Sequence, residues 1–257
     1  HGLLQPIADG LKLITKEDII PANASKILFI ASPAIAMVPA LLSIAVIPFG
    51  DTISIMGVSI DMVITDVNIG ILFILAVSSV GVYGILLGGW SSNNKYSLLG
   101  GLRSSAQMIS YELSMGLSLI GVIMMTESLS LVDTVNAQAD LWFVVLQPVA
   151  FVVYAISAIA ETNRCPFDLP EAETELVSGF HTEYSSMKFA LFFMAEYANI
   201  ITVSAVGVTF FFGGWRGPFL PPVVWFLIKM AMCIFFFVWL RSTFPRFRID
   251  QLMQFAW

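Results

Sequence analysis

Apolar residues are concentrated in six long stretches of the chain, separated by shorter polar segments. The stretches cover 27–48, 69–90, 104–126, 142–160, 187–212 and 222–240. About 20 apolar residues in a helix cross the hydrocarbon core of a bilayer, and backbone groups in lipid must pair within the protein. The alternation over about ten residues that marks a transmembrane β-strand is not visible. The pattern therefore predicts an all-α fold, a polytopic transmembrane helix bundle that forms a single membrane domain over 1–257.

The basic residues alternate with these stretches in a way that orients the chain. Ten of the twelve fall on one side if all six stretches cross the membrane: Lys12, Lys16, Lys26, Lys95, Arg103, Arg164, Lys188, Arg241, Arg246 and Arg248. The connections at 49–68 and 127–141, on the other side, contain no basic residue. Loops rich in lysine and arginine stay on the cytoplasmic side. We expect the positive side to be cytoplasmic in a bacterium, or to face the matrix in a mitochondrion.

The segment 3–17 is too short and too polar to cross the membrane, although its apolar residues recur at helical spacing. These residues are Leu4, Ile7, Leu11 and Ile14. Asp9, Lys12 and Lys16 lie elsewhere around the same helix. The pattern is typical of an amphipathic helix at a membrane surface, or of a helix that packs against another subunit. Both interpretations stay open.

Four charged residues lie inside the apolar stretches or at their rim. Glu112, Glu196 and Lys229 are well inside, and Glu161 follows the stretch 142–160 on the positive side. A charge at the centre of a bilayer costs roughly 3 kcal/mol, so we expect these side chains to face the bundle interior. Each of them could pair with an opposite charge and fix helix packing. Together they favour an ion or proton path, since buried acids can exchange protons near neutral pH.

The loop 161–186 concentrates acidic residues on the side of the chain that is otherwise basic. Six acids accompany a single arginine, Arg164: Glu161, Asp168, Glu171, Glu173, Glu175 and Glu183. Pro166 and Pro170 stiffen this loop. An ordered acidic loop could feed protons to the spans or form a docking face for a partner, and the residues alone do not decide between these.

Composition agrees with a membrane protein and argues against several other classes. Charged residues make up 12% of the chain and hydrophobic residues 58%, against roughly a quarter charged in soluble domains. With a net charge of −6 and no basic stripe, the chain is not expected to bind nucleic acid. Cys165 and Cys233 are far apart and His181 has no trusted ligand spacing, so no metal site is predicted. No motif for flavin, NAD or an iron–sulfur cluster is visible.

One family resembles this chain closely in three runs of sequence: GLLQPIADGLKLITKED (2–18), GWSSNNKYSLLGGLRSSAQMISYE (89–112) and AETNRCPFDLPEAETELVSGFHTEYSSMKFALFFMAEYAN (160–199). The closing run RSTFPRFRIDQLMQFAW (241–257) is similar to the same family. It is the family of the H subunit of bacterial NADH:quinone oxidoreductase, whose mitochondrial counterpart is subunit 1 of respiratory complex I. Its members have eight spans, so the resemblance implies that the six here are the second to the seventh and that one helix is missing at each end.

The resemblance implies a subunit that forms much of a quinone tunnel together with peripheral-arm subunits and couples quinone reduction to proton translocation. By motif, Glu112, Glu161 and Glu196 match the family's membrane glutamates. Arg164, Asp168, Glu171, Glu173 and Glu175 match its acidic loop, and Asp9, Lys12 and Phe192 match its quinone entrance. Lys229 and Glu183 are candidates from the charge pattern alone.

The implied partners are other complex I subunits, including small neighbouring membrane subunits, and the lipid bilayer. The implied substrate is ubiquinone or menaquinone, and the location is a bacterial plasma membrane or a mitochondrial inner membrane. Electron carriers would lie in other chains, so no complete active site is expected in this one. Two alternatives stay open: the equivalent subunit of a membrane-bound hydrogenase-type complex, and a stand-alone secondary transporter gated by buried charges.

Overall fold

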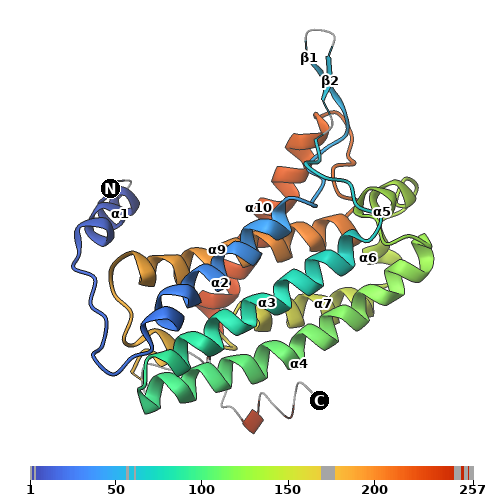
Figure 1. The fold of residues 1–257 in the computed structure, drawn as a ribbon. Helices are drawn as coiled ribbons and strands as arrows, with labels where there is room; N and C mark the ends of the chain where they lie inside the picture. The colour runs from blue at the N-terminus through green and yellow to red at the C-terminus, as the bar shows by residue number, and fades with distance from the viewer. Residues whose placement is uncertain are drawn as a thin grey trace.

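The computed structural model describes residues 2, 4–55, 58–60, 62–168, 177–245, 250, 251 and 254 (Figure 1). Its elements are α1 (Gln5–Thr15), α2 (Lys26–Ile44), β1 (Ile53–Ile55), β2 (Val58–Ile60), α3 (Gly70–Ser91), α4 (Lys95–Thr126), α5 (Leu131–Ala137), α6 (Phe143–Leu146), α7 (Pro148–Glu161), the 3-10 turn η1 (Gly179–His181), α9 (Ser186–Phe211) and α10 (Pro222–Thr243). The predicted all-α membrane fold is confirmed, because long apolar helices make up the body of the molecule. A small exception is the antiparallel hairpin β1–β2, which projects from the bundle in the connection predicted at 49–68.

Five helices of the described chain are long and apolar enough to cross a membrane: α2, α3, α4, α9 and α10. The sixth predicted span, 142–160, is instead divided between α6 and α7. Pro148 has no N–H for the preceding turn and restricts the residue before it, so Gln147 leaves the helical conformation with φ −130° and ψ 61°. The Gln147 side chain donates to the Gly121 carbonyl of α4 at 2.8 Å, which fixes the break against that helix. With 14 residues, α7 is only about 21 Å long.

The helix α4 begins well before the span predicted at 104–126. Asn94 caps it: the side-chain Oδ1 accepts a hydrogen bond of 3.0 Å from the backbone N–H of Tyr96. The helix then continues for 32 residues, which is about 48 Å and exceeds the roughly 30 Å of a bilayer's hydrocarbon core. Its first turns therefore extend out of the apolar stretch on the side where basic residues collect.

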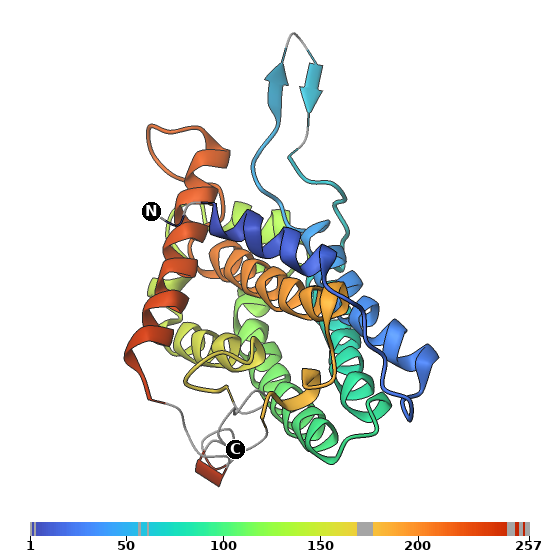
Figure 2. The same ribbon diagram turned by 90° about the vertical axis from the view of Figure 1, so that its left-hand side faces the viewer.

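The long helices pack as neighbours, with α3 between α2 and α4, α9 against α2 and α7 against α4 (Figures 1 and 2). Small residues allow the close approach. A Cβ on Gly84 of α3 would lie 2.6 Å from the backbone nitrogen of Ala36 in α2, and a Cβ on Gly100 of α4 would lie 2.7 Å from the Cα of Gly179. Membrane helices gain no hydrophobic drive from meeting each other, so van der Waals contact through small residues stabilises their packing.

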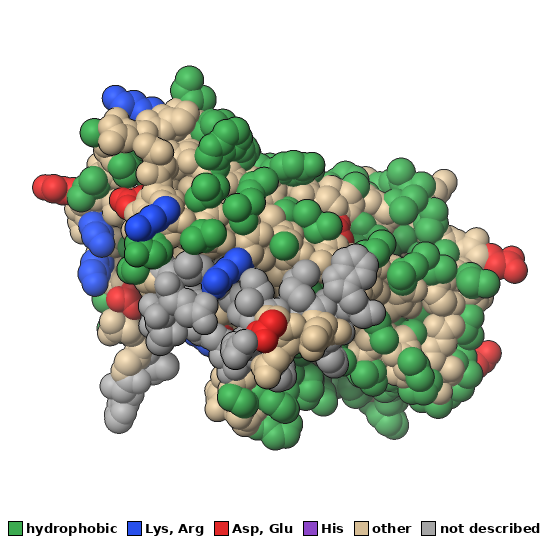
Figure 3. Space-filling model, turned by 90° about the horizontal axis from the view of Figure 1, so that it is seen from below, with side chains coloured by type: hydrophobic (Ala, Val, Ile, Leu, Met, Phe, Trp, Pro, Cys, Tyr) green, Lys and Arg blue, Asp and Glu red, His purple; other side chains and the backbone are tan. Residues whose placement is uncertain are grey.

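The outer surface of the bundle is apolar over much of its area. In Figure 3, hydrophobic side chains are spread across the face shown, while Lys and Arg side chains gather toward one end. Large apolar residues are more than half exposed on α4 and α10, among them Leu117 and Phe235. Such a surface is expected where lipid is the neighbour, because water would disfavour so large an exposed apolar area.

The helix α1 lies at the edge of the bundle against α9, attached mainly by polar contacts. None of its residues is buried, and the four apolar residues of its predicted stripe are each more than half exposed. Ser186 donates to the Leu13 carbonyl at 3.1 Å, and Lys188 of α9 forms an ion pair of 2.7 Å with Asp18. A helix thus occupies the predicted amphipathic segment, with its apolar face turned away from the described chain.

An aromatic cluster surrounds His181 in the 3-10 turn η1, which precedes α9. The imidazole lies among the rings of Phe180, Phe189 and Phe193, with centroid distances of 4.9, 5.3 and 5.6 Å. Its Nδ1 has no hydrogen-bond partner among the described residues. Burial lowers the pKa of His181 to about 4, because apolar surroundings disfavour the charged imidazolium.

This burial predicts a pH-dependent loss of stability that His181→Gln removes. The ordinary pKa of the side chain is 6.5 and the folded value is about 4, so the unfolded chain takes up the proton first as the pH falls. The stability that the neutral imidazole contributes is complete above pH 6.5 and is lost progressively toward pH 4. The loss is about 2 kcal/mol at pH 5. Thermal-inactivation midpoints of purified wild-type and variant protein, compared at neutral and acid pH, measure it; parallel curves would contradict the assignment.

Candidate functional site

Two of the predicted glutamates are held by adjacent hydroxyl groups on α3. Glu161, the last residue of α7, is 6% exposed, and its Oε1 accepts a hydrogen bond of 2.5 Å from Ser78. Glu112 of α4 is half-buried and accepts a hydrogen bond from Ser79. Ser78 and Ser79 are consecutive residues of α3, so the two carboxyl groups approach the same turn of that helix from α7 and from α4. The structure therefore brings Glu112 and Glu161 into one site.

The third predicted glutamate, Glu196 on α9, forms a buried ion pair with Arg164. Nη2 of Arg164 lies 2.8 Å from Oε2 of Glu196, and the two side chains are 8% and 10% exposed. The guanidinium also lies over the ring of Tyr197, 4.9 Å from its centroid. Removing two charges from water carries a large energetic penalty, which only a close, well-oriented pair offsets. Arg164, which was predicted as part of the acidic loop, therefore pairs with a residue inside the helix bundle.

The turn that follows α7 is fixed by polar side chains of α4. Gln107 donates from Nε2 to the carbonyls of Ala160 and Phe167 at 2.8 and 2.7 Å. Asn163, which has a left-handed φ of 50°, donates from Nδ2 to the Ser104 hydroxyl at 3.2 Å. Because these contacts hold the backbone on both sides of Arg164, they fix the position from which its side chain reaches Glu196.

Two of the remaining acids of the predicted loop are described by the structure, and they lie in separate places. Glu183 accepts a hydrogen bond of 2.6 Å from Asn94, at the turn between α3 and α4. Asp168 follows directly on the turn that Gln107 holds. Glu171, Glu173 and Glu175 lie outside the described residues. An acidic funnel that feeds protons to the spans therefore stays a prediction.

Lys229 of α10 holds the turn that follows α9. Its Nζ donates to the carbonyls of Phe212, Gly214 and Arg216 at 2.7, 3.0 and 2.6 Å. An ammonium has three N–H donors, so these carbonyls use all of them, and the group also lies 4.7 Å from the ring centroid of Trp142. No acidic residue of the described chain forms an ion pair with Lys229. The geometry shows that the ammonium holds this turn, and its predicted part in proton coupling stays a prediction.

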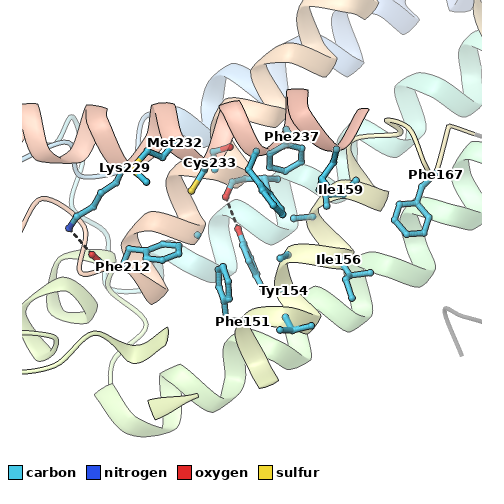
Figure 4. Close-up of a pocket in the computed structure, with 18 of the residues that line it drawn as sticks. Phe151, Tyr154, Ile156, Ile159, Phe167, Phe212, Lys229, Met232, Cys233 and Phe237 are labelled. Atoms are coloured by element: carbon cyan, nitrogen blue, oxygen red, sulfur yellow. Dashed lines mark hydrogen bonds between the residues drawn. The ribbon is translucent and has the colours of Figure 1, made fainter. Parts of the chain in front are cut away.

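A cavity of about 980 Å³ opens between α7, α9 and α10 (Figure 4). Its lining is almost wholly apolar, and Lys229 and Phe167 mark opposite ends of the group drawn. The hydroxyl of Tyr154 reaches it but already donates to the Val203 carbonyl at 2.7 Å. Such a lining suits an apolar chain better than a polar ring. No sequence pattern predicts this cavity, because it depends on the separation between α7 and α10, which apolar periodicity does not encode.

The residues assigned to a quinone entrance are placed differently from one another. Asp9 and Lys12 lie on the exposed helix α1, where Asp9 accepts a hydrogen bond of 3.2 Å from Gln5. Phe192 of α9 is 2% exposed and lies edge-on to the rings of Tyr184 and Phe180, at centroid distances of 4.9 and 5.2 Å. Phe192 is thus part of an aromatic core in the described structure.

The whole chain, residues 1–257, matches the family model described as NADH dehydrogenase. It is 59% identical to one NADH-quinone oxidoreductase H subunit of Geobacter sulfurreducens and 59% identical to one of Geobacter metallireducens. Identity to the NADH-quinone oxidoreductase H subunit of Thermomicrobium roseum is 53%. Each alignment covers 100% of this chain and 78% of the relative. The chain, with its buried carboxyl groups in a bundle of apolar helices, therefore belongs to the NADH dehydrogenase family, in the group of NADH-quinone oxidoreductase H subunits.

Proposed function

We propose that the chain forms part of the quinone tunnel of a proton-pumping NADH:quinone oxidoreductase, respiratory complex I, and couples quinone reduction to proton translocation through buried glutamates. The relatives are named as subunits of NADH-quinone oxidoreductases. Their names favour this function over the equivalent subunit of a hydrogenase-type complex and over a stand-alone transporter. Electrons reach the quinone from cofactors held by other subunits.

One observation carries the proposal: Glu112, Glu161 and Glu196 come from three different helices and all find polar partners inside the bundle. A serine hydroxyl can donate to a carboxylate and can accept from a protonated carboxyl group. Glu112 and Glu161 therefore keep a hydrogen bond in either protonation state. Because both acids bond to the same turn of α3, the gain or loss of a proton at one of them changes the affinity of the other for a proton.

The hydroxyl of Ser79 supports a carboxyl group that changes its protonation state. It lies 3.0 Å from the Leu75 carbonyl and also contacts Glu112. A hydroxyl has a single proton, so it cannot donate to both. Ser79 donates to Glu112 when that group is ionised, and it donates to the Leu75 carbonyl when a protonated Glu112 donates to Ser79.

We place the reacting quinone outside the described bundle, beyond the turn at 162–168, in a chamber completed by peripheral-arm subunits. Reduction of a quinone to a quinol takes two electrons and two protons, and the negative charge that forms acts on nearby ionic groups. The Arg164–Glu196 pair, carried by this turn and by α9, is suited to transmit that change into the bundle. The apolar stripe of α1, beside Asp9 and Lys12, suits the membrane surface where an apolar quinone tail enters. We place Phe192 in the wall behind it.

The location that follows is a bacterial plasma membrane, with the α7–α9 segment on the cytoplasmic side. The named relatives are bacterial, and the basic residues collect on this side. The predicted partners are the peripheral-arm subunits that complete the chamber and the small membrane subunits beside the bundle.

Glu112 and Glu161 form the serine-held pair, and neutralising either of them tests the coupling role. In the assembled oxidoreductase, Glu161→Gln and Glu112→Gln lower NADH-driven proton translocation by about ten-fold or more, because a glutamine keeps a hydrogen bond but cannot carry a proton. Proton uptake and quinone reduction are measured on the same membrane vesicles.

The matched control is Glu127→Gln, since Glu127 is an exposed residue that ends α4 outside the serine-held pair. It leaves both rates unchanged. Wild-type proton translocation in both Glu161→Gln and Glu112→Gln would reduce these residues to fixed structural groups.

The ion pair permits a separate test that divides stability from coupling. Arg164→Met removes one partner of the buried ion pair with Glu196, and breaking such a pair costs about 3–5 kcal/mol, so the subunit fails to accumulate in the assembled complex. The double variant Arg164→Met with Glu196→Gln removes both charges and recovers assembly while coupling stays impaired.

Lys188→Met is the control for the ion pair, because its partner Asp18 is 47% exposed and such a pair contributes about 1 kcal/mol or less. Immunodetection of the subunit in purified complex gives the assembly level, and proton translocation gives the coupling. A double variant with normal coupling would show that the pair serves only to stabilise the bundle.

A further inference from the structure

We infer that one ordered water molecule is bound between α3, α4, α7 and α9, held by the carboxyl group of Glu161 and the hydroxyl group of Thr202. A cavity of about 20 Å³ lies at this place, and Glu161, Asn199 and Thr202 are among the residues that line it. A cavity needs about 10–15 Å³ to hold one water. This one therefore has room for a water molecule.

Two buried polar atoms in the lining call for such a partner. Oε2 of Glu161 and Oγ1 of Thr202 have no hydrogen-bond partner among the described residues, and the two residues are 6% and 5% exposed. A buried polar atom left without a partner costs about 1–3 kcal/mol. A water can donate one hydrogen bond to the carboxylate and can accept another from the hydroxyl group, so it satisfies both atoms.

Thr202 differs from a threonine that is satisfied within its own helix. Thr209, two turns later on α9, is fully buried and donates to the Ala205 carbonyl four residues earlier, at 2.8 Å. This is the usual arrangement for a threonine inside a helix. Thr202 makes no such bond, and it lines the cavity together with Glu161.

The other hydroxyl groups around the cavity have already used their protons. Ser43 donates to the Pro39 carbonyl at 3.0 Å, Tyr154 donates to the Val203 carbonyl, and Ser78 donates to the other oxygen of Glu161. The groups left to hold a water are therefore Glu161, Thr202 and the amide of Asn199. Buried waters make about three hydrogen bonds on average, which these groups can supply.

The water gives the proposed coupling function a connection that side chains alone do not make. Asn199 lies three residues after Glu196 on α9, so both are on one face of that helix. A water between Glu161 and Asn199 extends the polar contacts of Glu161 to the face of α9 that carries Glu196. Ile71, Leu119 and Val206 line the same cavity and are almost fully buried. The water therefore connects polar groups of α7 and α9, and apolar side chains surround it on its other sides. Its role in proton transfer rests on the proposed function, whereas its presence does not.

Electron cryomicroscopy of the assembled oxidoreductase, at a resolution that shows buried waters, tests the site. We expect density for one water within hydrogen-bond distance of Glu161 and Thr202 in the wild type. Thr202→Val, which replaces the hydroxyl by a methyl group of similar size, removes that density. Thr209→Val is the matched control and keeps it, because Thr209 bonds to its own helix.

The absence of density in the wild type, where other buried waters are seen, would overturn the inference, and so would density that persists in Thr202→Val. Proton translocation by the same samples keeps the two proposals distinguishable. A water that is lost as expected, together with normal translocation in Glu161→Gln, would contradict the coupling function and leave the water site standing.

Discussion

A charged or polar group inside a membrane bundle has no water to turn to, so the protein must supply each partner. The described chain meets this requirement in three ways. Arg164 and Glu196 neutralise each other across the turn after α7 and α9. Lys229 gives all of its donors to backbone carbonyls at the end of α9. Glu112 and Glu161 form hydrogen bonds with serine hydroxyl groups. Of the three kinds of partner, a hydroxyl group restricts the protonation state of its neighbour least.

These three solutions have different consequences for function. The ion pair strongly favours its charged form, because a proton gained by Glu196 or lost by Arg164 would leave a buried charge unpaired. The lysine differs, since its partners are neutral carbonyls that take its three N–H donors. The serine-held acids are not committed in this way, since a hydroxyl can donate or accept. We therefore propose that Glu112 and Glu161 exchange protons and that the ion pair transmits a change at the polar turn to them. The helices α3 and α4 supply the framework, because glycine contacts hold them close to their neighbours.

The sequence predicted the helical membrane fold well, because a run of apolar residues long enough to cross a bilayer has few other uses. It predicted one continuous helix over 142–160, whereas Pro148 divides that stretch and Gln147 anchors the break to α4. It also identified Glu112, Glu161 and Glu196 as buried acids. It could not assign their partners, since the contacts of Arg164 with Glu196 and of Ser78 with Glu161 join residues 32 and 83 positions apart, whose meeting depends on helix packing. Lys229 was predicted from the same charge pattern as the acids, but the carbonyls that its ammonium meets depend on how α10 packs against the turn after α9.

The central claim is that Glu112 and Glu161 change protonation when the quinone is reduced. Infrared difference spectroscopy of the assembled oxidoreductase, reduced minus oxidised, measures this through the carbonyl stretch of protonated carboxyl groups. The account predicts a band in the wild type that is lost or diminished in Glu161→Gln or in Glu112→Gln, and that persists in Glu127→Gln. Identical difference spectra in the wild type and in both buried-acid variants would contradict it.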